Sequence, residues 1–201
     1  IGTNLHTVID WSSAIYFTDV MKTARRWEGV VDPVYNSDRL SYIPLGSGGI
    51  DVDADGYPTQ MPQQYNGKTY YLQTWMMTTS QTWPTGTYTV CYDGEPKVGD
   101  TQPLYLSGPI SNLTFVPSNN GQKPRYTFTY TQGSNNLRLA ITSSKLGNHI
   151  RNIKIIMPGY LNAQTCEPTQ TWYQPFLNAL APFPAIRLMD WMGTNRSAEE
   201  L

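Results

Sequence analysis

The chain has 201 residues, of which 14% are charged and 39% are hydrophobic, and its formal net charge is -1. This length suits one well-buried core, while the low and scattered charge offers no basic surface to a nucleic acid. Aromatic residues make up 12%, too many for a disordered chain, and the longest apolar runs are too short to cross a bilayer.

The first predicted element is a helix within residues 10–27, which Ser12 or Ser13 can cap. Four apolar residues then recur at the spacing of one helical face: Phe17, Val20, Met21 and Ala24. We expect this helix, near residues 12–26, to pack over one end of a β core.

Between residues 30 and 158 short alternating or β-branched runs are separated by turn residues, which favours strands. The predicted strands are residues 70–77, 86–92, 110–116, 126–131, 137–142 and 150–157. Tyr88, Val90 and Tyr92 share one face of the second strand. This spacing argues for an antiparallel sandwich or barrel, and we take a mainly antiparallel, jelly-roll-like β-sandwich as the fold class.

The last part of the chain changes pattern. Residues 175–180 predict a short helix, and residues 185–192 predict a buried strand that ends near Asp190. A strand so late in the chain is typical of the opening of another domain. We therefore expect a β-sandwich module over residues 1–165, followed over residues 166–201 by a linker, the helix and that first strand.

Four stretches in this order carry a family resemblance: residues 4–27 with Asp10-Trp11-Ser12, residues 53–62 with Gly56-Tyr57-Pro58-Thr59, residues 83–95 with Tyr92-Asp93-Gly94-Glu95, and residues 150–191 with Arg187-Leu188-Met189-Asp190-Trp191. They resemble the N-terminal region of large secreted, mostly bacterial proteins labelled cellulose-binding or carbohydrate-active. In that family a β-sandwich precedes a region like a glycoside-hydrolase barrel. The resemblance implies that residues 187–192 match the first barrel strand and that nearly all the other barrel strands, which would carry catalytic residues, are missing from this sequence.

Catalytic residues are hard to find in the sequence itself. A glycosidase needs two carboxylates across a cleft. Asp10, Asp93 and Glu95 suit a helix start or a turn, which leaves Asp190, at a strand end, as the one carboxylate to watch. The two histidines lack metal-ligand spacing. We expect no enzyme activity from this chain alone and no cofactor beyond the calcium ion considered next.

One motif has the front half of a calcium-binding loop. Asp51, Asp53 and Asp55 stand at alternate positions before Gly56, where oxygen ligands can converge on a hard cation. The twelfth position is Pro62 rather than a bidentate Glu. Two interpretations therefore remain open, a calcium site and an exposed acidic turn.

Aromatic residues are the main lead to a ligand, because a flat ring can stack on the C–H face of a sugar. Trp83, beside a proline and before a turn, is the first candidate, followed by Tyr57 in a Gly-Tyr-Pro loop and by Trp75. The competing interpretation is that these rings belong to the core, as most sandwich aromatics do.

Two further patterns bear on an extracellular location. Cys91 and Cys166 can form a disulfide or remain separate thiols. Both outcomes stay open, because the sequence does not fix the distance between the two residues. Asn112 and Asn195 begin Asn-x-Ser/Thr sequons, which are acceptors for N-linked glycans where the host glycosylates secreted proteins.

Together these features predict a non-catalytic carbohydrate-binding or scaffolding module of an extracellular glycan-active protein, with a polysaccharide as its partner. The first alternative is a structural module of an extracellular fibre or adhesin that associates with itself. The second is a fragment of a glycoside hydrolase whose barrel is mostly missing.

Overall fold

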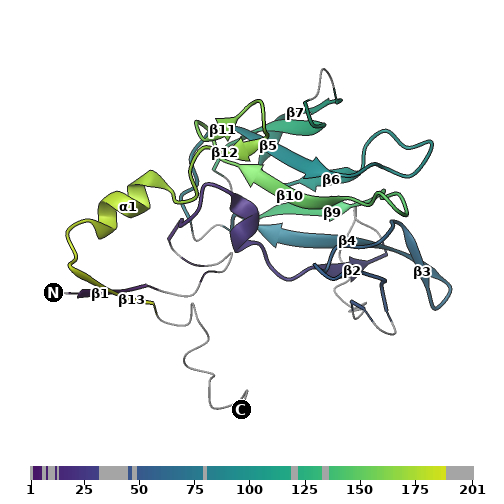
Figure 1. Cartoon of the computed structure of the whole chain (residues 1–201), viewed down its shortest axis with the longest axis horizontal. Helices are drawn as coiled ribbons and strands as arrows, with labels where there is room; N and C mark the ends of the chain where they lie inside the picture. Colours follow the sequence, from purple (N-terminus) through teal and green to yellow (C-terminus); the bar gives the residue numbers. More distant parts are fainter. Residues whose placement is uncertain are drawn as a thin grey trace, which may run out of the picture.

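The computed structural model describes residues 2–5, 8, 12, 14–31, 45–46, 49–78, 81–118, 122–132 and 136–188. Most of the strand residues belong to two antiparallel sheets, which confirms the predicted all-β, sandwich-like fold (Figure 1). The four-stranded sheet, in the order β10-β5-β8-β7, contains β5 (Gly86–Asp93), β7 (Ile110–Val116), β8 (Arg125–Tyr130) and β10 (Arg151–Ile156). The five-stranded sheet, in the order β2-β4-β9-β6 with β3 beside β4, contains β2 (Glu28–Val30), β3 (Gln63–Tyr65), β4 (Lys68–Met76), β6 (Leu104–Ser107) and β9 (Leu137–Ile141).

The core lies between the inner faces of these two sheets. Alternate residues of the longer strands β4, β5 and β8 enter it, as the period of two requires. Tyr88, Val90 and Tyr92 on β5 are all buried and share the core-facing side, which confirms that prediction. Leu72 on β4 and Leu139 on β9 enter the same cluster from the five-stranded sheet.

The predicted N-terminal helix is wrong for the residues that the structure describes. Within 14–27 only Val20–Thr23 is helical, as a single 3-10 turn (η1). The backbone before it pairs with distant strands instead, because Asp19 bridges to Ile156 and its carboxylate accepts hydrogen bonds from the Met21 and Ile155 amides at 3.1 and 3.0 Å. Val20 is still fully buried, so the apolar stripe packs on the core without forming the helix.

The C-terminal part forms three small units. The hairpin of β11 (Leu161–Asn162) and β12 (Glu167–Pro168) follows β10, and the predicted short helix is confirmed as α1 (Gln174–Leu180). Of the strand predicted at residues 185–192, Ala185–Leu188 forms β13, which pairs in parallel with β1 (Gly2–Leu5), and residues 189–192 lie outside the described residues. The predicted burial of this strand is wrong, because the side chains of Ala185 and Ile186 are exposed. Helix α1 and the β1–β13 pair lie to one side of the sandwich (Figure 1).

Candidate functional site

Trp83 is not an exposed platform, and the expectation that it would be is wrong. Its side chain is 2% exposed and belongs to the main core. The reason is the loop before β5: the Gln132 side chain accepts a hydrogen bond from the Trp83 amide at 3.2 Å and donates one to the Gln81 carbonyl at 3.0 Å. These bonds fix the backbone so that the ring turns inward, where a large apolar area is buried.

Tyr57 is half-buried, and its ring packs against the main core. Burial raises the pKa of its hydroxyl above the ordinary value, despite opposing hydrogen bonds with the backbone at Asn152 and Ile153. A ring anchored at both its face and its hydroxyl offers little free surface to a ligand.

The Asp51–Asp55 segment forms a turn rather than a group of converging carboxylates. The Asp53 carboxylate accepts hydrogen bonds from the backbone amides of Asp55 and Tyr57 at 3.0 and 2.8 Å, and it lies 2.7 Å from His149 Nε2. Burial alone would raise the pKa of Asp53, but these hydrogen bonds outweigh burial and lower the pKa below its ordinary value.

Asp51 is exposed, and its backbone is held by the Gln63 amide group at 2.8 and 2.9 Å. Asp55 is exposed as well. Across the described ranges, no group of three or more His, Cys, Asp or Glu side chains could hold a metal ion. The structure therefore does not bring the three predicted calcium ligands together.

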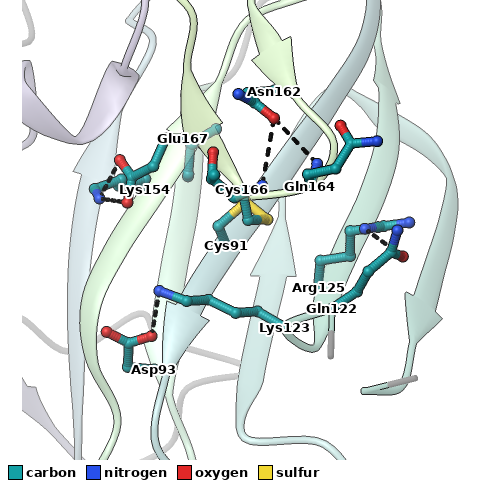
Figure 2. The surroundings of a disulfide bond; sticks show 12 residues. Cys91, Asp93, Gln122, Lys123, Arg125, Lys154, Asn162, Gln164, Cys166 and Glu167 are labelled. Carbon is teal, nitrogen blue, oxygen red and sulfur yellow. Dashed lines mark hydrogen bonds and ion pairs between the residues drawn. A yellow bond between two sulfur atoms is a disulfide. The ribbon is translucent and has the colours of Figure 1, made fainter. Parts of the chain in front are cut away.

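Cys91 and Cys166 form a disulfide, which settles the alternative that the sequence left open. The bond ties β12 and its hairpin to the outer face of the four-stranded sheet, beside the ion pair of Lys154 with Glu167 (Figure 2). Cys91, Cys166 and Ile156 make a small second core there. A disulfide of this kind is typical of proteins that fold in an oxidising compartment.

The first sequon residue, Asn112, is exposed on β7, at the edge of the four-stranded sheet. Its φ angle is 54°, and the pairing register of β7 with β8 shifts between Ser111 and Thr114. Asn195 and the candidate carboxylate Asp190 lie outside the described residues.

Trp75 is the one predicted sugar-stacking residue that the structure places away from the main core. It lies on β4 with Gln73, on the side opposite to the buried Leu72. Pairing with β9 and β6 sets Trp75 beside Arg138 and Ser107, and sets Gln73 in one row with Ala140 and Tyr105. We call the following side chains of this face the outer-face cluster: Gln73, Trp75, Tyr105, Ser107 and Arg138.

Arg138 holds the outer-face cluster together. Its guanidinium carbon lies 5.6 Å from the centroid of the Trp75 ring and 5.7 Å from that of the Tyr105 ring. Its Nε donates a hydrogen bond to Ser107 Oγ at 3.1 Å. A cation over two aromatic faces is an attractive arrangement, and it orients both rings on the same side of the sheet.

Three buried polar atoms of this cluster have no hydrogen-bond partner: Gln73 Nε2, Gln73 Oε1 and Trp75 Nε1. Gln73 is wholly buried, whereas Trp75 and Tyr105 are half-buried. Buried polar groups in folded proteins are nearly always paired, so an unpaired amide and an unpaired indole N–H in one cluster require an explanation. Together they offer N–H donors and one carbonyl acceptor to a ligand that both donates and accepts.

Sequence reasoning named Trp75 but missed Gln73, Tyr105 and Arg138. The alternation of Tyr71, Gln73 and Trp75 within one strand was a signal, because it puts an amide between two aromatics on a single face. Tyr105 and Arg138 carried no such signal, since the strand with Tyr105 was not predicted.

No protein-family model, no curated protein and no solved structure matches this chain. Among the described residues, no helix is both long and apolar enough to cross a membrane.

Proposed function

We propose that this chain is a non-catalytic carbohydrate-binding module of an extracellular glycan-active protein, and that it binds its ligand at the outer-face cluster. One observation carries the proposal: on the face that holds the Trp75 and Tyr105 rings, the buried side-chain amide of Gln73 and the indole N–H of Trp75 have no hydrogen-bond partner. Ligand sites commonly combine apolar or aromatic walls with a few polar groups that fix orientation.

The chemistry of a sugar suits this combination. Each hydroxyl both donates and accepts a hydrogen bond, and the amide of Gln73 offers both complements. The C–H face of the ring suits the flat faces of Trp75 and Tyr105, whose electron density attracts weakly positive C–H groups. Glu28, opposite Gln73 on β2, is the one carboxylate among the strand residues that the structure describes on this face. A glycosidase would need a pair.

The extracellular setting rests on two supports. One is the Cys91–Cys166 disulfide, which is rare in reducing compartments. The other is the sequence resemblance to secreted proteins that act on glycans.

The test is retention of the protein on insoluble glucan, xylan, mannan and chitin, followed by substitution of two tryptophans. Trp75→Ala should weaken retention about fivefold or more, since a stacked ring contributes on the order of 1 kcal/mol. The control is Trp172→Ala, which removes an exposed aromatic ring outside the outer-face cluster. The Trp172 ring is 36% exposed and stacks on Phe17 at 4.8 Å, and its loss should leave retention unchanged. Circular dichroism would verify that both variants are folded.

Two results would count against the proposal. Loss of retention in Trp172→Ala alone would move the site to the Phe17–Trp172 surface. If no polysaccharide retains the protein while it self-assembles at modest concentration, the fibre or adhesin alternative should replace glycan binding.

A second candidate, part of a larger glycoside hydrolase, is favoured by the β1–β13 pair. Two parallel strands with a helix on their connection are the elements of a β–α–β unit, and parallel sheets normally bury both faces under helices. Here Ile186 of β13 is 43% exposed. This pair would then be the start of a larger parallel sheet, with the sandwich inserted between β1 and α1.

Hydrogen exchange tests this second candidate. If the pair is incomplete by itself, the amides of β1 and β13 should exchange much faster in the 201-residue chain than those of β5 and β8. Protection of β13 equal to that of β5 would show that the pair is complete and would remove this candidate.

A further inference from the structure

We infer that the outer-face cluster recognises the end of a glycan chain, and that Gln73 reads a pair of neighbouring hydroxyls on the terminal sugar. This inference rests on the proposed function and deepens it, because it specifies which part of the glycan binds. Gln73 is more deeply buried than the rings of Trp75 and Tyr105 on the same face.

Gln73 points away from the main core. On β4 the core side is occupied by Tyr70, Leu72 and Met76, and residues in between project to the other face. Gln73 is nevertheless 0% exposed, so its amide lies at the base of the outer-face cluster. Trp75, two residues further along β4, and Tyr105, in the same row but two strands away, are half-buried, so the Gln73 amide lies deeper than either ring.

The unpaired amide is the feature that a purely structural role does not explain. Leaving a buried donor and a buried acceptor without partners is destabilising, and a hydrophobic residue of similar size would avoid it. Ala140, the neighbour of Gln73 on β9, is itself fully buried and apolar. Buried polar groups are normally hydrogen-bonded, and an exception that nothing inside the fold compensates is expected at a functional site.

The geometry of an amide selects the kind of hydroxyl group. Oε1 accepts from one hydroxyl while Nε2 donates to the next, so a carboxamide matches two hydroxyls on adjacent carbons. Trp75 Nε1, also unpaired, supplies a further donor beside them. Binding groups of this kind take a neutral sugar that carries vicinal hydroxyls.

The depth of the Gln73 amide favours a terminal sugar over one inside a glycan chain. A sugar inside a polymer is linked on both sides and can lie along a surface, but it cannot enter a buried position without both neighbours following. A terminal sugar is linked on one side only. Arg138 is 7% exposed and its guanidinium lies against the Trp75 and Tyr105 rings, so a sugar that stacks on those ring faces must displace it.

Calorimetric titration with cello-, xylo-, manno- and chito-oligosaccharides, from monosaccharide to hexasaccharide, tests this inference. For the series that binds, affinity should level off at the disaccharide and stay constant for longer chains. Gln73→Leu should weaken binding about tenfold or more, because hydroxyls that lose their partners are strongly discriminated against. The same variant should raise Tm by about 2–4 °C, since it removes an unpaired buried amide.

The matched control is Gln164→Leu, an exposed Gln→Leu change on the disulfide-bound hairpin of the other sheet, which should alter neither affinity nor Tm. If Gln73→Leu does not fold, Gln73→Met replaces it, with an unbranched side chain of similar volume.

The possible results separate the inference from the proposed function. Affinity that rises with chain length, together with unchanged binding by Gln73→Leu, would overturn chain-end recognition while glycan binding stands. A lower Tm for both Gln73→Leu and Gln73→Met would show that the Gln73 amide is satisfied within the fold and would also overturn the inference. Absence of binding to every oligosaccharide and every polysaccharide would overturn both.

Discussion

The outer faces of the two sheets are built by the same alternation of residues, but they differ in whether their buried polar groups have partners. On the four-stranded sheet, Cys91 bonds to the β11–β12 hairpin and Asp93 accepts a hydrogen bond from Asn152 at 2.8 Å. Among the described residues, none of this face's buried side-chain polar atoms lacks a partner. On the five-stranded sheet, Gln73 and Trp75 retain buried polar atoms without partners. One face is closed by covalent and ionic contacts, and the other keeps its hydrogen-bonding capacity.

A strand's period of two therefore predicts which residues face outward, but it does not predict which groups they contact there. Substitutions on one face at a time test this difference. A structural face should change stability when its contacts are removed, whereas a binding face should change affinity more than stability.

The largest expected effect is on the four-stranded side. Replacing both Cys91 and Cys166 by Ala should lower the free energy of unfolding by about 2–5 kcal/mol, because the bond closes a long loop, with a sequence separation of 75. Urea denaturation measures the loss. Glycan retention of the folded double variant should be unchanged. A parallel loss of retention would show that the two faces are coupled.

A smaller effect is expected from Arg138 on the five-stranded side. Arg138→Ala removes the cation from the Trp75 and Tyr105 rings and should lower the free energy of unfolding by about 1–2 kcal/mol in a urea titration. Arg138→Lys keeps the charge but loses the planar guanidinium, so it should retain only part of the stability that Arg138→Ala loses. Full restoration by Lys would mean that charge alone, without stacking, matters here.

Acid should weaken the end of the sandwich that holds Asp53. Its pKa is lowered in the folded state, so the stabilisation it provides is present above its unfolded pKa, about 4, and is lost as the pH falls through the lower folded value. Asp53→Asn should therefore be less stable at neutral pH and should lose less stability below about pH 4. Urea midpoints measured across this range test it. Identical pH profiles for the two proteins would contradict the role of the carboxylate.

The smallest effect is expected from the ion pair next to the disulfide. The side chains of Lys154 and Glu167 are 29% and 42% exposed, and pairs this accessible contribute less than about 1 kcal/mol. A double-mutant cycle with Lys154→Ala and Glu167→Ala, run with the disulfide intact, isolates the coupling free energy. A coupling of several kcal/mol would mean that the pair, rather than the disulfide, secures the hairpin.

Parts of the fold were predictable because they depend on neighbours in the chain. The predicted strand at residues 110–116 matches β7, and the core-facing row on β5 follows from alternation alone. The four-residue β6 was missed, and with it Tyr105. The helix was wrongly predicted because its apolar spacing also fits an irregular segment that packs on the core. The backbone amide of the distant Ile155 donates a hydrogen bond to the Asp19 carboxylate, which holds the segment in that conformation.

The candidate site was predictable only in part for a related reason. Trp75 could be named from its residue type, as Trp83 was, and the sequence could not separate the two. A loop fixed by Gln132 turned Trp83 into the core, whereas the strand position of Trp75 placed it outside.

Spacing within a few residues was enough to predict a β-rich fold, the inward residues of the longer strands, and the short helix α1. The Cys91–Cys166 bond and the outer-face cluster depend instead on contacts between distant segments of the chain. Gln73, Tyr105 and Arg138 are far apart in the chain and become neighbours through the pairing of β4, β9 and β6. The register of non-local strand pairs is set by the packing of the whole sandwich, and no local pattern contains it.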